Sequence, residues 1–149
     1  MEIVIFRHGD SPQIFESKVM NDFERPLSEK GIYEVKKSAL NLKKENFSAN
    51  IIVSSPFKRA VETSMIIKEV LNIKDFLVED FLKPGSDIEE IIKFIKTQTE
   101  NIILVGHMPI VGRIAKKFCG GEYFFPCGSY LRIYLKEHNN AYIISQYLP

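Results

Sequence analysis

The sequence predicts an α/β protein of three layers, an α/β/α sandwich whose mostly parallel sheet ends in an antiparallel edge hairpin. Short apolar runs alternate along the chain with segments in which apolar residues recur every three or four positions, as they do where strands alternate with helices. The last two strand-like runs follow one another with no helical segment between them. A length of 149 residues fits one domain, residues 1–149, that buries a substantial core.

The first part of the chain predicts a strand, a long loop and a helix. Residues 3–6 are all apolar, which is typical of a strand covered on both faces. Residues 10–26 have no regular period, and we expect a loop of the kind that often lies near a functional site. Ser28 is the expected N-cap of the next helix. The residues expected to face inward from this helix are Ile32, Val35, Ala39 and Leu42.

The middle part predicts a second strand, a helix and a third strand. Residues 51–53 are apolar and β-branched, and residues 76–78 form the next strand-like run. Between them, Ser55 and Pro56 have the residue types of an N-cap and a first helical position. The residues expected to face inward from the helix that follows are Ala60, Ser64, Ile67 and Leu71.

The last part predicts two further helices, a fourth parallel strand and the hairpin. Residues 102–105 are a buried strand, and a helix is expected to begin near Pro109. Residues 130–135 and 141–147 pair as a hairpin with its turn at residues 139–140. The inward residues are Ile88, Ile91, Ile92 and Ile95 in the helix before the fourth strand, and Val111, Ile114, Ala115 and Phe118 in the helix after it.

Composition narrows the class of partner. With 20 basic and 19 acidic side chains the chain has no bulk affinity for nucleic acid or for an acidic membrane. There is no basic flank with a cleavage site near the first residue and no apolar run of roughly 20 residues, so we expect a cytoplasmic protein that has neither nucleic acid nor membrane as partner. Cys119 and Cys127 are close enough in sequence for a disulfide, but thiols are favoured in that compartment.

Basic and imidazole side chains gather where strands end. Arg7 and His8 directly follow the first strand, His107 follows the fourth, and Arg59 lies just beyond the second. Ligands of such sheets bind beyond the carboxyl ends of the strands, so these four residues predict one anion site. Arginine suits phosphate because its planar fork donates several hydrogen bonds, and a histidine among arginines stays partly neutral and nucleophilic. The third histidine, His138, is expected on the surface.

Four motifs carry a family resemblance that covers nearly the whole chain. The chain resembles the histidine phosphatase superfamily, the phosphoglycerate-mutase-like enzymes, and is most similar to their SixA-type phosphohistidine phosphatases. The motifs are Arg7-His8-Gly9-Asp10, then Arg25-Pro26-Leu27-Ser28 with Gly31, then Ser54-Ser55-Pro56-Phe57-Lys58-Arg59-Ala60 with Glu62-Thr63, and finally Gly106-His107-Met108-Pro109-Ile110-Val111-Gly112.

The resemblance implies roles for the four site residues. His8 would be the nucleophile and would carry the phosphoryl group as a phosphohistidine intermediate that water then releases. Arg7, Arg59 and His107 would bind the phosphate oxygens, and Gly9 would let phosphate approach the backbone. The reaction would need no metal and no organic cofactor. Because His8 ends a strand, we also expect it in an exposed, polar setting.

The general acid is the least defined part of the predicted site. Asp10 is a candidate to orient His8 or to hold the loop, although a backbone carbonyl can do the first equally well. Glu79 and Asp80 lie after the third strand, where many members of the superfamily carry a catalytic carboxylate, but neither aligns clearly. Arg25 is left open between a place at the mouth of the site and a simple ion pair with Glu24 or Glu29.

The resemblance favours a phosphohistidine phosphatase that acts on a histidine of a signalling or phosphocarrier protein. Protonated imidazole leaves phosphorus readily, so an ill-defined acid is compatible with such a substrate. Two alternatives stay open: a phosphatase of small phosphate esters, and a phosphoprotein-binding module without turnover. Binding alone would not require the nucleophile.

Overall fold

A six-stranded sheet forms the middle layer of the computed structural model, which describes residues 1–137 and 140–149. The strand order across the sheet is β3-β2-β4-β1-β5-β6. The four strands from β3 to β1 are parallel, and β5 and β6 add an antiparallel hairpin at one edge, as predicted. The strands are β1 (Glu2–Arg7), β2 (Ile51–Ser54), β3 (Asp75–Val78), β4 (Ile102–Gly106), β5 (Tyr130–Leu135) and β6 (Ala141–Tyr147).

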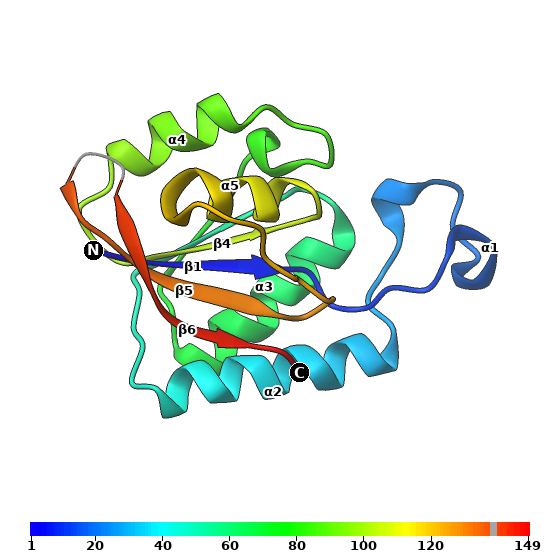
Figure 1. Ribbon diagram of the computed structural model, residues 1–149. Helices are drawn as coiled ribbons and strands as arrows, with labels where there is room; N and C mark the ends of the chain where they lie inside the picture. The colour runs from blue at the N-terminus through cyan, green and yellow to red at the C-terminus, as the bar shows by residue number, and fades with distance from the viewer. Residues whose placement is uncertain (138–139) are drawn as a thin grey trace.

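Helices cover both faces of this sheet and complete the predicted three layers (Figure 1). Helices α2 and α3 pack against one face, and α4 and α5 pack against the other. The helices are α1 (Ile14–Ser17), α2 (Glu29–Lys44), α3 (Lys58–Leu71), α4 (Ile88–Lys96) and α5 (Ile110–Cys119), with short 3-10 turns η1 (Asp22–Glu24) and η2 (Asp80–Leu82).

Strand β1 is central and its side chains alternate between the two halves of the core. Ile3 and Ile5 belong to the cluster under α4 and α5, whereas Val4 and Phe6 belong to the cluster under α2 and α3. All four are fully buried, which explains why the run is apolar without alternation. The strand pairs with β4 in parallel and with β5 in antiparallel register.

The segment predicted as an unstructured loop contains two short helical elements instead. Within this segment residues 14–17 form α1 and residues 22–24 form η1. Helix α1 projects from the body beyond the carboxyl ends of the strands (Figure 1), whereas η1 contacts α3. One turn of helix has too few positions for a 3.6-residue apolar period to be visible, so the pattern could not reveal them. The side chain of Asn21 accepts a hydrogen bond from the backbone of Glu24 and closes η1.

Helix α2 has the predicted N-cap but not all of its predicted inward residues. The hydroxyl of Ser28 accepts a hydrogen bond from the Gly31 backbone. Val35, Ala39 and Leu42 are buried as expected. Ile32, however, is 37% exposed, and Gly31 takes the first inward position instead. The expectation for Ile32 was wrong because the first turn packs against backbone rather than against apolar side chains.

Helix α3 begins later than predicted. Phe57 is the N-cap and Lys58 the first helical residue, so Ser55 and Pro56 lie outside the helix. The Ser55 hydroxyl accepts a hydrogen bond from the Phe57 backbone and contacts His107, so it is not free to cap. The other helix and strand assignments are confirmed within a few residues. The hairpin turn predicted at residues 139–140 and the surface position expected for His138 involve residues outside the described part of the chain.

Two expectations from composition can be compared with the structure. Within residues 1–137 and 140–149, no helix has the length and apolar character required to traverse a bilayer. Cys119 and Cys127 are both free thiols, in agreement with the favoured reading.

Candidate active site

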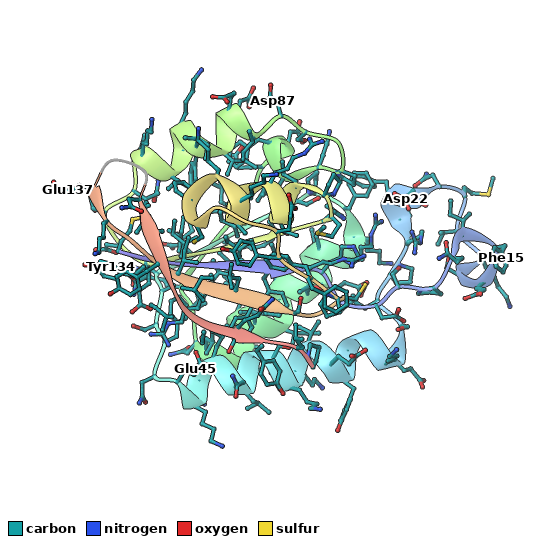
Figure 2. The ribbon with its side chains drawn as sticks, viewed as in Figure 1. Phe15, Asp22, Glu45, Asp87, Tyr134 and Glu137 are labelled. Atoms are coloured by element: carbon teal, nitrogen blue, oxygen red, sulfur yellow. The ribbon has the colours of Figure 1, made fainter. Side chains whose placement is uncertain are left out.

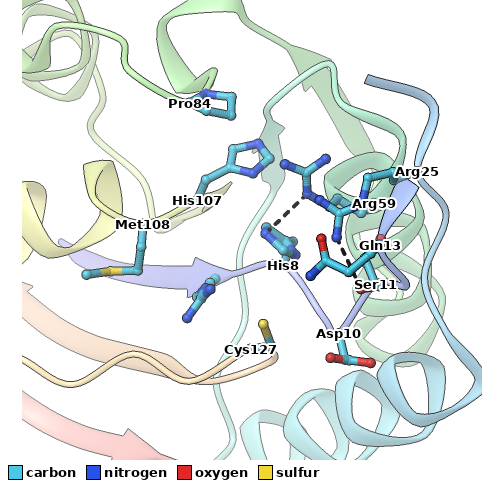
Figure 3. A pocket seen from close by; sticks show the side chains of 11 residues that line it. His8, Asp10, Ser11, Gln13, Arg25, Arg59, Pro84, His107, Met108 and Cys127 are labelled. Carbon is cyan, nitrogen blue, oxygen red and sulfur yellow. Dashed lines mark hydrogen bonds between the residues drawn. The ribbon is translucent and has the colours of Figure 1, made fainter. Parts of the chain in front are cut away.

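The four predicted site residues line one pocket of about 310 Å³ at the carboxyl ends of β1 and β4. Figure 3 shows His8, Arg59 and His107 converging on it, with Arg25 and Asp10 at its rim. The register between β1 and β4 explains why His8 and His107 lie close together. Arg7 is paired with Gly106 across β1 and β4, so the residues that follow them, His8 and His107, emerge side by side. Their ring centroids are 4.8 Å apart.

The ring of His8 is oriented by a backbone carbonyl. Its Nδ1 lies 2.7 Å from the Gly9 carbonyl oxygen, which can only accept, so Nδ1 carries the proton. The lone pair of a neutral His8 is therefore on Nε2, which faces the Nε of Arg59 at 3.4 Å. Of the two roles considered for Asp10, the orienting one is filled by this carbonyl.

His8 lies in a buried setting, which corrects the expectation of an exposed one. It is only 7% exposed although it lines the pocket, so the residues around it cover most of the ring. Burial lowers its pKa to about 4, helped by the positive charges of Arg59 and Arg7 and opposed by the Gly9 carbonyl. The ring is neutral at pH 7, which is the form that can attack an electrophilic phosphorus.

His107 is more deeply buried, at 2% exposure. It is held by Ser55, which was predicted as a helix N-cap and not as a site residue. Its Nε2 lies 2.7 Å from the hydroxyl oxygen of Ser55. Its Nδ1 is buried and has no hydrogen-bond partner among the described residues. Burial lowers the pKa of His107 to about 2, and the nearby His8 and Arg59 add to the effect. This ring too is neutral at pH 7.

The two predicted arginines are anchored differently. One Nη of Arg7 donates to the Phe125 carbonyl at 2.7 Å, while its buried Nε has no partner among the described residues. Arg59 lies in the first turn of α3, and one Nη donates to the backbone carbonyl of Asp22 at 2.9 Å. The ring of Phe57 packs against the Arg59 guanidinium with 5.1 Å between them. Unpartnered guanidinium nitrogen in a pocket is what an oxyanion requires.

Asp22 is a site contact that the sequence analysis missed. Its carboxylate lies 3.2 Å from Arg59 and 2.8 Å from Arg25. Partial burial raises the pKa of Asp22, but hydrogen bonds and charge from Arg25 and Arg59 outweigh this and lower it, so the carboxylate is ionised. It therefore occupies one edge of the Arg59 fork. Its contact with Arg59 leaves no local signal, because the two residues are 37 positions apart, although Arg25 is only three positions away.

Arg25, whose place in the structure the sequence alone did not decide, lines the pocket. It pairs with Asp22 rather than with Glu24 or Glu29, and it also donates to the carbonyls of Pro12 and Ser11. Arg25 thus joins both sides of the segment that walls the pocket. It adds a third positive charge to the site.

The loop after His8 is fixed by the start of α2 and by α3. One Asp10 carboxylate oxygen accepts a hydrogen bond of 2.6 Å from the Ser28 hydroxyl. A Cβ atom on Gly31 would lie 2.2 Å from the Asp10 carbonyl oxygen, so only glycine permits this approach. The Gly9 backbone donates to Thr63, whose hydroxyl in turn donates to the Arg59 carbonyl. Asp10 therefore holds the loop.

Glu79 and Asp80 lie apart from the other predicted site residues. Among the described residues that line the pocket, their segment contributes Pro84 and neither carboxylate. Asp80 is exposed and pairs with Lys83 at 3.3 Å. The carboxylate that does line the pocket is that of Asp10. Cys127 and Met108, which the sequence analysis did not select, complete the opposite wall.

Two neutral imidazoles lie among three guanidiniums in one pocket at the carboxyl ends of the parallel strands, a set of groups that is able to bind an anion. The family model for the histidine phosphatase superfamily (branch 1) matches residues 3–83. That match spans more than half of the chain, and the protein belongs to this superfamily.

The chain is 28% identical over 127 residues to the phosphohistidine phosphatase SixA of Escherichia coli, a match that covers 82% of this chain and 76% of that protein. It is 37% identical over 82 residues to the 2,3-bisphosphoglycerate-dependent phosphoglycerate mutase of Nautilia profundicola, which covers 55% of this chain but 34% of the mutase. The solved structure of the protein histidine phosphatase SixA with tungstate superimposes with a TM-score of 0.89 at 25% identity, covering 98% and 96% of the two chains.

Proposed function

We propose that this protein is a phosphohistidine phosphatase that removes the phosphoryl group from a histidine of another protein. The observation that carries the proposal is the neutral, carbonyl-oriented His8 beside His107 and the arginines in one pocket. A relative that matches over 82% of this chain and 76% of its own length is named as a phosphohistidine phosphatase. The bound tungstate in the SixA structure is a tetrahedral oxyanion of the same shape as phosphate.

The reaction proceeds through two transfers of the phosphoryl group. In the first, the Nε2 lone pair of His8 attacks phosphorus and the bond between phosphorus and the substrate imidazole breaks. The other nitrogen of that imidazole is already protonated, so the ring leaves as neutral imidazole. In the second, water attacks the phosphorus on His8, the bond to Nε2 breaks, and inorganic phosphate and free His8 result. Arg7, Arg59 and His107 stabilise the charge on the phosphate oxygens in both transition states.

The chemistry of the leaving group supports phosphohistidine over an ester. An alkoxide needs a proton donor in the transition state, whereas imidazole departs already protonated. Glu79 and Asp80 lie away from the pocket, and the Asp10 carboxylate is engaged by Ser28. We propose that no dedicated carboxyl acid is required, that the reaction uses neither metal nor organic cofactor, and that the protein works in the cytoplasm.

An exposed apolar surface at the rim of the pocket favours a protein substrate, such as a phosphotransfer domain or a phosphocarrier. The α1–η1 arm, residues 13–24, carries apolar side chains that are not buried: Phe15 is 81% exposed and Met20 is 91% exposed. Figure 2 shows Phe15 at the tip of the arm, pointing away from the body. Gln13, at the start of the same arm, lines the pocket. A partner that presents its phosphohistidine to the pocket would cover this apolar surface.

A selectivity assay tests the proposal. A phosphorylated histidine-phosphotransfer protein and a small aryl phosphate are offered to the same enzyme, and the kcat/KM values are compared. We expect the protein substrate to be preferred by at least about 10²-fold, since it gains both the easier leaving group and the arm contacts. An equal or inverted preference would identify a phosphatase of small esters. Binding without any turnover would identify a phosphoprotein-binding module.

The arm contributes a second readout in the same assay. Replacing Phe15 and Met20 together by serine should raise KM for the protein substrate several-fold and leave the aryl phosphate unaffected. Leu40→Ser is the matched control, because Leu40 is an exposed apolar residue on the outer side of α2.

A further inference from the structure

The hydroxyl of Ser55 lies between two nitrogen atoms in the interior of the protein. Ser55 is fully buried at the end of β2, where its backbone donates to the Val105 carbonyl of β4. Its hydroxyl oxygen accepts a hydrogen bond from the Phe57 backbone at 3.3 Å and lies 2.7 Å from the Nε2 of His107. Ser54 pairs with Val105 across the parallel strands β2 and β4, so Ser55 and His107, which follow the ends of these strands, are neighbours.

The proton between Ser55 and His107 can be assigned from what each atom needs. The Phe57 N–H can only donate, so the Ser55 oxygen accepts there and its own hydrogen needs an acceptor. His107 Nε2 is the acceptor within reach among the described residues. The opposite arrangement, with Nε2–H donating to Ser55, would leave the serine hydrogen buried without an acceptor, which costs about 1 to 3 kcal/mol.

The consequence for His107 appears at its other nitrogen. A neutral imidazole carries one hydrogen, so if Nε2 accepts from Ser55 the hydrogen is on Nδ1. That Nδ1 is buried and has no partner among the described residues, although its side chain lines the pocket. An Nδ1–H is a ready donor to a phosphate oxygen, whereas an Nδ1 lone pair would repel one. His8 and His107 thus present opposite groups, a lone pair and a donor, from neighbouring rings.

We propose that Ser55 is a positioning residue that holds His107 in the Nδ1–H tautomer, and thereby turns a neutral histidine into a hydrogen-bond donor for the phosphoryl group. The expected effect of Ser55 on kcat rests on the proposed function, whereas the assignment of the His107 tautomer does not. Neutrality of the ring agrees with its burial, which strongly lowers the pKa of His107.

The direct test is the ¹⁵N chemical shift of the His107 ring in the whole protein at neutral pH, assigned by the loss of its cross-peaks in His107→Ala. We expect Nδ1 in the protonated range and Nε2 in the unprotonated range. A ring with Nε2 protonated, or a fully protonated ring, would overturn the proposal. In Ser55→Ala the ring should move toward the Nε2–H form. This readout requires neither turnover nor substrate.

Kinetics provide the second arm. Ser55→Ala should lower kcat about 10- to 100-fold with little change in KM, which is less than the 10²- to 10³-fold typical of deleting an oxyanion donor, because the imidazole is retained. Ser55→Thr keeps the hydroxyl and should restore the tautomer and most of kcat. Ser54→Ala is the matched control: Ser54 is equally buried, and its hydroxyl donates to the Ser55 carbonyl instead.

The outcomes separate the two proposals. An unchanged tautomer and an unchanged kcat in Ser55→Ala would overturn the positioning role. A wild-type enzyme that shows the expected tautomer but hydrolyses no phosphohistidine protein would overturn the proposed function and leave the tautomer assignment standing.

Discussion

Burial determines the chemistry of the two site histidines more than any single charge does. His8 and His107 are removed from water beneath the pocket, and the arginines around them add repulsion to the cationic forms. The histidines are therefore neutral in the range in which free histidine is half protonated. Neutral His8 keeps a lone pair on Nε2, which in this structure accepts a long hydrogen bond of 3.4 Å from the Nε of Arg59.

This neutrality predicts a dependence of stability on pH. The pKa of each ring is near 6.5 in the unfolded chain and falls to about 4 for His8 and about 2 for His107 in the folded protein. Below pH 6.5 these histidines bind protons in the unfolded chain but stay neutral in the folded protein. The free energy of unfolding therefore falls as pH is lowered, by up to about 1.4 kcal/mol per pH unit for each ring. The contribution of His8 to this fall in the free energy of unfolding is complete near pH 4, where the folded protein also binds the proton.

Urea denaturation at several pH values between about 6.5 and 4.5 measures this slope. We expect His8→Gln to remove about half of the slope of the wild type, since one of the two buried rings no longer titrates. Parallel lines for wild type and variant would show that His8 is already protonated or exposed in the folded state.

Carboxylates outside the pocket should matter little for the proposed substrate. We expect Glu79→Gln and Asp80→Asn each to change single-turnover rates on a phosphohistidine protein by less than about threefold, because positioned acid catalysis is worth about 10²- to 10⁴-fold and neither side chain lines the pocket. The same variants are assayed on an aryl phosphate for comparison. A loss of 10²-fold on the phosphohistidine substrate would mean that one of these carboxyls is an essential acid.

At the scale of elements, the start of α2 and the loop after β1 form one unit. Ser28 caps the helix and also donates to Asp10, and the absence of a side chain at Gly31 lets the Asp10 backbone rest on the helix. The motif from Arg25 to Gly31 is thus explained by the geometry behind His8 as well as by the pocket wall.

Gly31→Ala tests this unit. The new Cβ would lie 2.2 Å from a backbone oxygen, which cannot move aside as a flexible side chain can, so we expect destabilisation by about 1 to 3 kcal/mol despite the better helix propensity of alanine. Gly112→Ala in α5 is the control, since its Cβ would meet only the flexible end of Met108 at 3.2 Å. Thermal or urea melts decide: equal effects of the two substitutions would contradict the packing described here.

The regular elements could be predicted because their signals are local. An apolar run such as residues 102–105, or the stripe of Ile88, Ile91, Ile92 and Ile95, records burial within a few positions of itself. Ser55 shows the limit of such signals. A serine before a proline is a sound local indication of an N-cap, but its hydroxyl is engaged by a histidine 52 positions away. The contact of Asp22 with Arg59 is equally distant in sequence, at 37 positions, although its other partner, Arg25, is only three positions away.

At the scale of the whole molecule, the parallel sheet explains why residues distant in sequence form one site. Strands β1, β2 and β4 end at the same edge, and their following residues provide His8, Ser55 and His107. The strand-end rule therefore predicted the meeting of Arg7, His8, Arg59 and His107 from sequence alone. The burial of the two rings and the arm at the rim depend on packing across the molecule, which a single sequence pattern does not encode.

The central claim is that the phosphoryl group passes through His8. Its most direct test is a rapid-quench reaction of the enzyme with a radiolabelled phosphohistidine protein, followed by peptide mapping of the trapped enzyme. We predict a label that is stable to alkali, labile to acid, located on His8 and absent from His8→Ala. A label on another residue, or turnover at the wild-type rate by His8→Ala, would contradict the account.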